Sequence, residues 1–596
     1  MNNPKIIINP SKASVVIHKL KGIKSYTTSN ELIYNLSGIK SFFTNQDEYE
    51  WFYSLLKKSQ QISEPMKRRE YGDYQTSKEL SDKIISLLIN KYVEPDIVFE
   101  PTFGLGSFIL SSLKYFKNIK NIYGVEIYPE YYWNTKISIL EYYIDNPVKK
   151  KPNIELFCAD IFTYDLSYIK RNDGRILVIG NPPWITNSEL SVLNSNNLPQ
   201  KSNFKLLNGF DAITGKGNFD IAEFIILMMI KSFSSNDGWL SMLCKNSVIK
   251  NIIYDLKDFK YSISDITSYN IDSKYYFNVS VDASLLHCKY NNSSDDVICN
   301  VSNIENPNYV IKKYGWYNDK FVSNIDTYKD LKIFDSYSPI IWRQGVKHDC
   351  SKVMELERVN GKYKNGYGDI IDIESDLVYG LAKSSDVRNM SISNPRKYVI
   401  ITQKKVGDDT KFIKDKYPKL YSYLEKNKQY FLRRKSSIYK GKSLYSIFGI
   451  GDYSFKRYKV AISGLYKSPI FSLILPENDK PMMLDDTCYF IGFDNIQDAL
   501  ISWVALNSTS ALKLLDSLTF SDSKRPYTKD VLMRINIVDL LKYISLDYIN
   551  DRIKKVNSNI FITQTQLDDY INLHNNLNIE SPQYSLFEKR RSYIVK

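Results

Sequence analysis

Residues 95–127, PDIVFEPTFGLGSFILSSLKYFKNIKNIYGVEI, contain two short apolar runs separated by a glycine-containing turn and a helical pattern. The first run, 97–100, leads into EPTFGLG, where two glycines let the backbone turn sharply and approach a ligand closely. Segment 107–116 then places apolar residues at helical spacing, and 121–127 is again a short apolar run. This order predicts a strand, a helix and a second strand, the repeating unit of a parallel sheet.

The same alternation continues on both sides of this segment. Helices are predicted at 77–90, 130–144 and 219–233, and strands at 153–160, 175–180, 238–244 and 281–288. Strands that alternate with helices favour an α/β fold with a mostly parallel sheet covered on both faces. Ligands of such sheets bind beyond the carboxyl ends of the strands, so the site residues are expected there.

The chain is long enough for several domains. It has 596 residues, of which 43% are hydrophobic and 24% charged, values typical of a globular protein. The strand–helix alternation fades near residue 291, where 290–303 is rich in Asn, Ser and Asp. We therefore expect an N-terminal extension over 1–70, an α/β domain over 71–290 and a different region over 291–596.

Two carboxylates follow the glycine turn at the ends of successive predicted strands. Glu126 lies some twenty residues after the glycines, where a carboxylate can accept hydrogen bonds from the hydroxyls of a ribose. Asp160 ends the next strand and could accept from an adenine amino group. Each has a structural alternative, a surface or helix-initiating position for Glu126 and a helix N-cap for Asp160. Ile109 replaces the third glycine of the dinucleotide pattern, which favours an adenosine-type ligand without a pyrophosphate.

Residues 181–184, Asn-Pro-Pro-Trp, directly follow the fourth strand of this pattern. The two prolines fix φ and carry no backbone N–H, so the backbone at these two positions can accept hydrogen bonds but cannot donate them. The side-chain carbonyl of Asn181 and the backbone carbonyl of Pro182 then form a rigid pair of acceptors suited to an exocyclic amine. Trp184 supplies a flat face on which a nucleobase can stack. The structural alternative is a proline-terminated strand with a packing tryptophan, but the position in the pattern favours binding.

In this order the segments resemble the gamma group (TaqI-type) of S-adenosylmethionine-dependent adenine-N6 DNA methyltransferases from restriction-modification systems. EPTFGLG is similar to the cofactor loop of that group, VEIYP and CAD to its two cofactor-binding acids, and NPPW to its catalytic motif. The other matching segments are YQTS (74–77), GKGNFDIAEF (215–224), GWLSMLCKNSVI (238–249) and YYFNVSVDASLL (275–286). The resemblance implies a Rossmann-like class I methyltransferase sheet followed by a mixed α/β C-terminal target-recognition region.

The resemblance also implies the reaction and the residues that perform it. The methyl group of S-adenosylmethionine would pass to the N6 amine of a flipped-out adenine in double-stranded DNA. Catalytic residues would be Asn181, Pro182, Pro183 and Trp184, with Trp184 and Phe277 stacking on the target base and Tyr276 as the alternative register for Phe277. Cofactor contacts would come from Thr76, Glu100, Pro101, Gly104, Gly106, Glu126 and Asp160, with Ile127 and Phe224 on the two faces of the cofactor adenine.

The positive charge of the chain is concentrated in one segment. Residues 396–470 hold 19 Lys and Arg against 5 Asp and Glu, an excess equal to the net charge of +14 for the whole chain. They also contain 14 Tyr or Phe, and this interleaving suits a polyanion, although a solvated basic surface is the alternative. Segments 341–357, 454–467 and 523–532 loosely resemble target-recognition regions. The candidate DNA-binding residues are Arg433, Arg434, Lys435, Lys456, Arg457 and Lys459.

Other functions stay open at this point. RNA methyltransferases and protein-glutamine methyltransferases share the NPP grip, but they are generally compact, whereas this chain has a long basic C-terminal region. Related cytosine-amine enzymes usually begin the motif with Ser, so Asn181 favours adenine. A catalytically silent DNA-recognition protein on the same scaffold is a further alternative.

The remaining features concern metals, membranes and location. The six cysteines and four histidines are scattered, so no metal is expected, and a reducing bacterial or similar cytoplasm is the expected location. Neither a membrane span nor a secretory signal is expected. Residues 1–70 are too short for a fused nuclease, which leaves a separate restriction endonuclease open as a partner beside double-stranded DNA.

Overall fold

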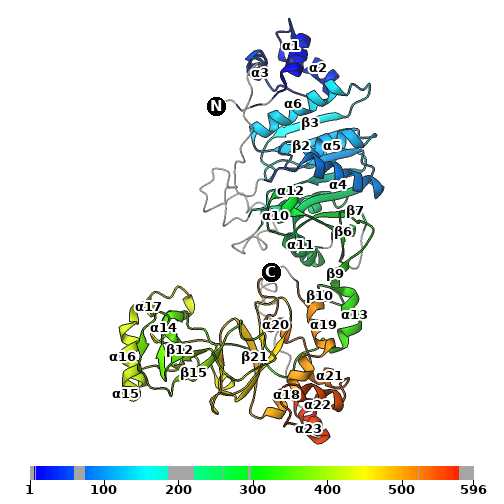
Figure 1. Ribbon diagram of the computed structural model, residues 1–596. Coiled ribbons are helices and arrows are strands. Elements are labelled where there is room, and N and C mark those ends of the chain that lie inside the picture. The colour runs from blue at the N-terminus through cyan, green and yellow to red at the C-terminus, as the bar shows by residue number, and fades with distance from the viewer. Residues whose placement is uncertain are drawn as a thin grey trace, which may run out of the picture. The chain divides into compact units, whose positions relative to one another are not determined.

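The computed structural model describes residues 4, 6, 8–58, 74–185, 220–259, 261–292, 297–520 and 523–575 (Figure 1). The chain divides into two compact units, Met1–Phe321 and Val322–Lys596, here called unit 1 and unit 2. Within the described residues, no helix combines the length and the apolar character that crossing a bilayer requires.

Unit 1 is built on a ten-stranded sheet with the order β10-β9-β8-β6-β7-β5-β4-β1-β2-β3. The strands are β1 (Ile97–Glu100), β2 (Asn121–Glu126), β3 (Asn153–Cys158), β4 (Ile176–Gly180), β5 (Gly238–Lys245), β6 (Ile263–Ile271), β7 (Ala283–Tyr290), β8 (Ile298–Asn303), β9 (Lys312–Tyr317) and β10 (Lys320–Val322). The helices are α1 (Pro10–Leu20), α2 (Tyr26–Ser37), α3 (Gln46–Lys58), α4 (Lys78–Asn90), α5 (Ser107–Tyr115), α6 (Pro129–Asp145), α7 (Ser167–Lys170), α10 (Ile221–Phe233), α11 (Asn246–Phe259) and α12 (Ser273–Phe277).

The centre of this sheet is doubly wound. β1 pairs in parallel with both β2 and β4, and the order β3-β2-β1-β4-β5 is parallel throughout. β7 runs antiparallel between β5 and β6. Every residue of β1 and β4 is buried, as expected for strands covered on both faces. The predicted Rossmann-like class I methyltransferase sheet is confirmed.

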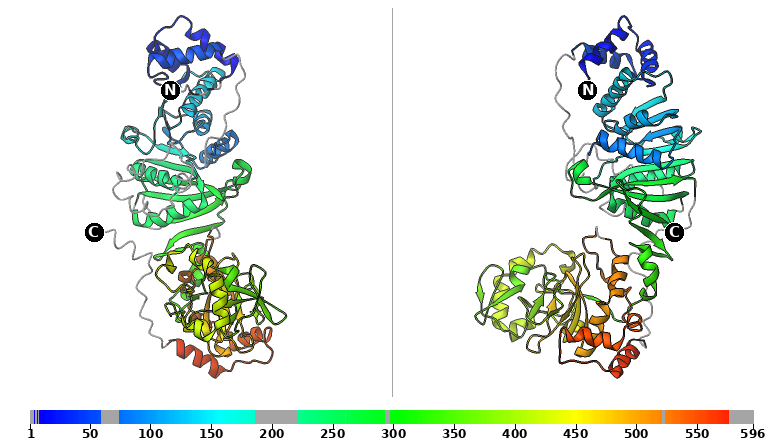
Figure 2. Two further views of the ribbon diagram at one scale, coloured as in Figure 1. Left: turned by 90° about the vertical axis from the view of Figure 1, so that its left-hand side faces the viewer. Right: turned by 45° about the vertical axis from the view of Figure 1, so that its right-hand side comes forward.

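Helices α1–α3 pack beside α6 near β3, at the edge of the sheet (Figure 2). Ile39 forms a parallel bridge to Ile154 of β3. The fully buried Lys136 of α6 donates to the carbonyl of Phe42 at 2.7 Å and lies 4.8 Å from the ring centroid of Trp133. The predicted N-terminal extension therefore contributes apolar and polar contacts to the same core as the sheet.

The sheet extends past the expected boundary after residue 290. β8, β9 and β10 add to the edge formed by β6, with β8 parallel to β6 and β9 antiparallel to β8. The sequence prediction also omitted β6, which lies between β7 and β8 and whose pairing with β7 shifts register between Ser264 and Thr267. Strands that mix apolar with polar residues and lack a regular alternation are hard to distinguish from loops by sequence.

Unit 2 contains a six-stranded sheet, β14-β13-β12-β17-β15-β20, and a five-stranded sheet, β11-β21-β18-β19-β16. The strands are β11 (Arg343–Gln344), β12 (Glu355–Val359), β13 (Lys362–Lys364), β14 (Ile370–Ile371), β15 (Val378–Ala382), β16 (Ser391–Ile392), β17 (Lys397–Ile400), β18 (Tyr458–Ser463), β19 (Phe471–Ile474), β20 (Met483–Leu484) and β21 (Cys488–Phe493). The α-helices are α13 (Ile325–Leu331), α14 (Ser351–Met354), α15 (Phe412–Lys416), α16 (Pro418–Lys426), α17 (Lys428–Leu432), α18 (Ile496–Leu506), α19 (Thr509–Leu518), α20 (Lys529–Leu532), α21 (Ile537–Leu541), α22 (Leu546–Lys554) and α23 (Gln564–Asn575). The mixed α/β character predicted for the C-terminal region is confirmed.

Candidate active site

A pocket lies at the carboxyl ends of the central parallel strands of unit 1. Its walls come from the turn after β1, the residues after β2, β3 and β4, the segment Tyr74–Thr76 and the first turns of α10. The predicted site residues that line it are Thr76, Glu100, Pro101, Gly104, Glu126, Ile127, Asp160, Asn181 and Pro183. Five separately predicted segments thus meet in one cavity, at the edge where ligands of parallel sheets bind.

The two glycines of the turn after β1 are required by the protein's own side chains. Both have positive φ, 52° at Gly104 and 71° at Gly106. A Cβ at Gly104 would lie 2.5 Å from Gln75 Oε1, and one at Gly106 would lie 2.4 Å from Thr135 Cγ2. Gly106 packs against Thr135 of α6 and is not among the residues that line the pocket. Its contact with the cofactor stays a prediction, and its close approach to α6 is a second reason for a glycine at this position.

Glu126 holds the glycine turn from the end of β2. Its Oε2 accepts from the Gly104 N–H at 2.9 Å, and its Oε1 accepts from the Tyr128 N–H at 2.8 Å. Each carboxylate oxygen has a second lone pair, so Glu126 can still accept from a ligand hydroxyl. The sequence predicted the ligand-facing role of Glu126 but not its hydrogen bond across to Gly104.

The pocket is acidic. Glu100, Glu126 and Asp160 line it, and no Lys or Arg is among the described residues of its wall. Glu100 is 2% exposed. Burial raises the pKa of the Glu100 carboxyl well above its usual range, and the nearby Glu126 carboxylate raises it further. Such a pocket suits a cationic ligand and disfavours a phosphate, in agreement with the prediction from the incomplete glycine pattern.

Phe224 does not form a wall of the pocket. Its ring packs against Phe162 at 5.3 Å between centroids, and it is Phe162 that lines the cavity together with Ile127. Ile221 and Ile225 of α10 line the cavity, and the Phe224 ring lies behind Phe162. The contact of Phe224 with the cofactor adenine stays a prediction, and Phe162, two residues after Asp160, is an aromatic residue of the pocket wall that the sequence prediction did not name.

Asn181 presents one unused acceptor beside the pocket. Its Nδ2 donates to the Tyr74 carbonyl at 2.8 Å and to Thr76 Oγ1 at 3.2 Å. Its Oδ1 is buried and has no hydrogen-bond partner among the residues that the structure describes. A buried acceptor without a hydrogen bond costs about 1–3 kcal/mol of folding free energy. A hydrogen-bond donor on a bound ligand would recover this cost. The geometry therefore fits the predicted role of Asn181 as an acceptor for an amine.

The two predicted base-stacking residues contact each other. Phe277, the last residue of α12, lies with its ring centroid 5.0 Å from that of Trp184 at an interplanar angle of 68°. Tyr74 packs against both rings, at 5.3 Å from Trp184 and 6.1 Å from Phe277. Tyr276 instead interacts with Lys83, so Phe277 is the aromatic at the site. Two rings in edge contact leave no room for a flat base between them.

Some of the predicted DNA-binding residues of unit 2 are exposed, and others already form ion pairs or hydrogen bonds within the protein. Arg433 and Lys435 are exposed. Lys456 is paired with Asp494 and Arg457 with Asp479, both at the surface.

The segment GKGNFDIAEF (215–224) of unit 1, which resembles a motif of the methyltransferase group, is described only in part. Its residues 215–219 lie outside the described residues.

Arg434 and Lys459 hold the fold of unit 2 and are corrected to structural residues. The guanidinium of Arg434 donates to the carbonyls of His348, Leu444 and Ser446 at 3.2, 2.6 and 2.8 Å. Lys459 is 1% exposed and donates to the Lys456 carbonyl at 2.7 Å. Burial lowers the pKa of the Lys459 ammonium to about 7. Sequence alone counts such residues with the surface charges because it cannot show burial.

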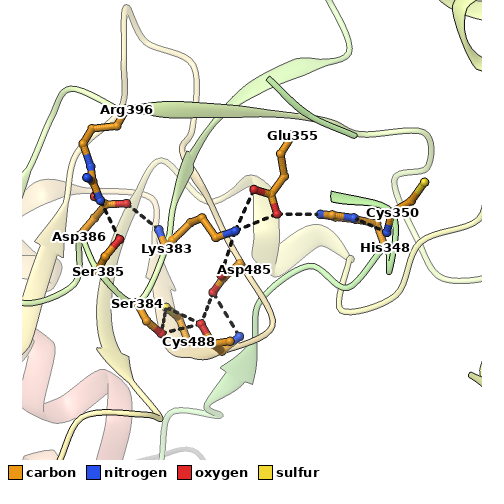
Figure 3. A network of polar contacts seen from close by, with 11 residues as sticks. His348, Cys350, Glu355, Lys383, Ser384, Ser385, Asp386, Arg396, Asp485 and Cys488 are labelled. Atoms are coloured by element: carbon orange, nitrogen blue, oxygen red, sulfur yellow. Dashed lines mark hydrogen bonds and ion pairs between the residues drawn. The ribbon is translucent and has the colours of Figure 1, made fainter. Parts of the chain in front are cut away.

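A polar network connects three loops of unit 2 (Figure 3). Lys383, after β15, donates to both carboxylate oxygens of Glu355 at 2.8 and 2.9 Å and lies 4.0 Å from Asp485. His348 Nδ1 accepts from the Cys350 N–H at 3.2 Å, and its Nε2 lies 3.6 Å from Glu355. Over the described residues, no three His, Cys, Asp or Glu side chains are grouped as metal ligands. The network compensates the buried Glu355 and orders the loops around it.

Comparisons with known proteins show the family of this chain. The family described as N-6 DNA Methylase matches residues 46–339. The Type II methyltransferase M.NspV of Nostoc sp. (strain PCC 7524) is 39% identical over 478 residues, which are 80% of this chain and 98% of that protein. The chain belongs to the N-6 DNA methylase family. As an N-6 DNA methylase it is a DNA-adenine methyltransferase, which confirms the enzyme class predicted from the strand-end motifs.

Two solved structures resemble this N-6 DNA methylase over most of its length. The Type IIL restriction-modification enzyme MmeI, in complex with DNA, has a TM-score of 0.47 at 10% identity and covers 87% of this chain and 74% of its own. The type IIG restriction endonuclease BpuSI has a TM-score of 0.36 at 13% identity and covers 89% and 68%.

Proposed function

We propose that this N-6 DNA methylase uses S-adenosylmethionine to methylate a flipped-out adenine within a defined sequence of double-stranded DNA. The observation that carries the proposal is the buried Oδ1 of Asn181 at the rim of a carboxylate-lined pocket, which has no hydrogen-bond partner in the described part of the chain. The proposal extends the family assignment by naming the donor, the form of the DNA and the residues.

The residues that line the pocket support this donor. S-adenosylmethionine supplies an electrophilic methyl group on a sulfonium. Its positive charge suits a wall with the carboxylates of Glu126 and Asp160. Glu126 would accept from the ribose hydroxyls, and Asp160 from the adenine amine. Ile127 and Phe162 would contact the faces of the adenine ring.

The catalytic residues would act on the amine of the target base. Asn181 Oδ1 and the Pro182 carbonyl would accept its two hydrogens. This draws the nitrogen lone pair out of conjugation and stabilises the positive charge that grows in the transition state. The alignment of the amine with the methyl group would supply most of the remaining rate enhancement. After the transfer, the amine would release one proton to water.

A base within a duplex cannot reach such a pocket, so the target adenine would have to be flipped out. Stacking on Trp184 and Phe277 would recover part of that free energy, about 1–3 kcal/mol per base. Because these two rings are in edge contact, they would have to separate when the base enters.

The biological setting proposed is a restriction-modification system. M.NspV, which matches most of this chain, is described as a Type II methyltransferase. A separate restriction endonuclease with the same target sequence would be its partner. Unit 2 would read the DNA sequence, with the exposed cations of 396–470 on the phosphates.

The test is methyl transfer from tritiated S-adenosylmethionine by the purified full chain, with duplex DNA, single-stranded RNA and protein as separate substrates. We expect label only in DNA, recovered as N6-methyladenine and located by single-molecule sequencing at one short sequence. Label in RNA, in glutamine or in cytosine, or no label in DNA, would refute the proposal.

Exposed and buried cations of unit 2 are expected to differ in their effect on DNA affinity. Arg433→Gln together with Lys435→Gln removes two exposed charges. We expect weaker binding on every DNA sequence and a decrease of about one per lost phosphate contact in the slope of log K against log salt. Lys459→Met, at a buried position, is the matched control and should leave both values unchanged. Fluorescence anisotropy at several salt concentrations measures the DNA affinity and its salt dependence. Equal effects of the two variants would mean that Arg433 and Lys435 do not contact DNA.

A further inference from the structure

The amide of Asn181 makes two hydrogen bonds that fix which of its ends faces the pocket. We propose that Tyr74 and Thr76 are positioning residues, which accept both bonds of the Asn181 nitrogen and thereby turn its oxygen toward the substrate amine. The inference rests on the proposed function, since it assigns a cause to the orientation of the group that would bind the target base.

The identity of the partners settles the orientation of the amide. The Tyr74 carbonyl, 2.8 Å from Nδ2, can only accept a hydrogen bond. A flipped amide would therefore bring two acceptor oxygens together at that distance. The hydroxyl of Thr76, 3.2 Å from Nδ2, serves as the second acceptor. Oδ1 is then the end that remains buried without a partner.

Segment 74–76 is itself held in place by the glycine turn and the start of α5. Ser107 Oγ donates to the Thr76 carbonyl at 2.7 Å. The Leu105 N–H donates to Gln75 Oε1 at 3.0 Å, and the Gln75 side chain fills the space beside Gly104. The segment thus connects the loop of the cofactor pocket directly to Asn181, so that both are placed by one short stretch of backbone.

The ring of Tyr74 holds the segment from the other side. It packs against Trp184, three residues after Asn181, and against Phe277 of α12. The Tyr74 carbonyl is therefore fixed between the glycine turn and the aromatic residues. A side chain at position 181 must both donate to this carbonyl and accept from the substrate, which asparagine does and aspartate in its ionised form does not.

Asn181→Asp separates this requirement from a simple need for an acceptor. The introduced carboxylate keeps an oxygen for the substrate amine but faces the Tyr74 carbonyl with the other. We expect kcat at saturating cofactor to fall at least about 100-fold at pH 8. Protonation gives the carboxyl a hydrogen for the Tyr74 carbonyl, so the ratio of variant to wild-type kcat should rise as the pH is lowered from 8.5 to 6.

The ratio is used because Glu100, Glu126 and Asp160 face the same pocket in both proteins. Their titration affects both rates, and the ratio removes it. Asn181→Ala is the matched control: it has no titrating group and should give a low ratio that does not change with pH. A ratio for Asn181→Asp that stays flat or falls at low pH would overturn the inference.

Thr76 supplies the second, independent arm. Thr76→Val removes one acceptor at nearly constant volume and is expected to have a kcat at saturating cofactor about five-fold below that of Thr76→Ser, which keeps the hydroxyl. Circular dichroism and thermal unfolding check that both variants fold. Equal kcat for Val and Ser would contradict a positioning role. If Asn181→Ala itself retains full activity, the proposed function fails rather than the positioning inference.

Discussion

Alanine at position 181 is expected to lower kcat for methyl transfer about 10²–10³-fold while the Kd for S-adenosylmethionine stays within about two-fold of wild type. The reason is that Asn181 Oδ1 is the buried acceptor without a partner, whereas the carboxylates that would hold the cofactor belong to other strand ends. Single-turnover methylation with tritiated cofactor gives the rate, and isothermal titration calorimetry gives the Kd.

The control for this variant is another asparagine of unit 1 that is fully engaged with the backbone. Asn172 donates from its side chain to the carbonyls of Tyr168 and Ile169, outside the pocket. Asn172→Ala should leave both the rate and the Kd unchanged. If Asn181→Ala loses cofactor affinity as strongly as rate, the residue acts on the cofactor pocket and not on the target amine.

The second large effect is expected at Glu126, where alanine should raise the Kd for S-adenosylmethionine at least about 100-fold, because bonds to a charged acceptor contribute about 1.5–3 kcal/mol each. Two such bonds, from Gly104 and Tyr128, are lost together with the proposed ribose contact. The glycine turn loses the carboxylate that fixes it, so the pocket itself should loosen. Calorimetry measures the affinity, and hydrogen exchange of the Gly104 amide reports the loosening.

Glu155→Ala is the matched control, because Glu155 lies in β3 beside Lys40 and outside the pocket. It removes one carboxylate from unit 1 without touching the glycine turn, and its Kd should equal that of the wild type. A normal Kd for Glu126→Ala, with rapid exchange at Gly104, would limit Glu126 to a structural role in the turn.

The central elements could be predicted because their signals are local. The strand at 97–100 has the predicted bounds, and the helix predicted at 77–90 forms α4 with Ser77 as its N-cap. Apolar spacing of 2 or 3.6 residues, together with caps and glycines, is written in neighbouring positions and needs no knowledge of the fold. The residues that directly follow each strand could be predicted in the same way, because parallel pairing brings the ends of these strands to one edge of the sheet.

Features that depend on packing between distant segments were predicted less well. The boundary after 290 failed because β8–β10 are joined to the sheet only by their pairing with β6 and each other. Phe224 was assigned to the pocket, whereas its ring packs behind Phe162, which lines the cavity. The Lys and Arg count of 396–470 included Arg434, whose guanidinium is bound to backbone carbonyls, and Lys459, which is buried.

The amino-acid sequence by itself determined the central strands β1 to β5 and β7, the edge of the sheet where the site lies and the residue types available for chemistry there. Only the tertiary structure decided which donor and acceptor atoms of those residues remain available to bind a ligand. The Asn181 amide, for example, is oriented by a carbonyl 107 positions away in the chain. Hydrogen-bond partners and burial are set by segments that meet only on folding, and one donor or acceptor more or less determines what a buried side chain can bind.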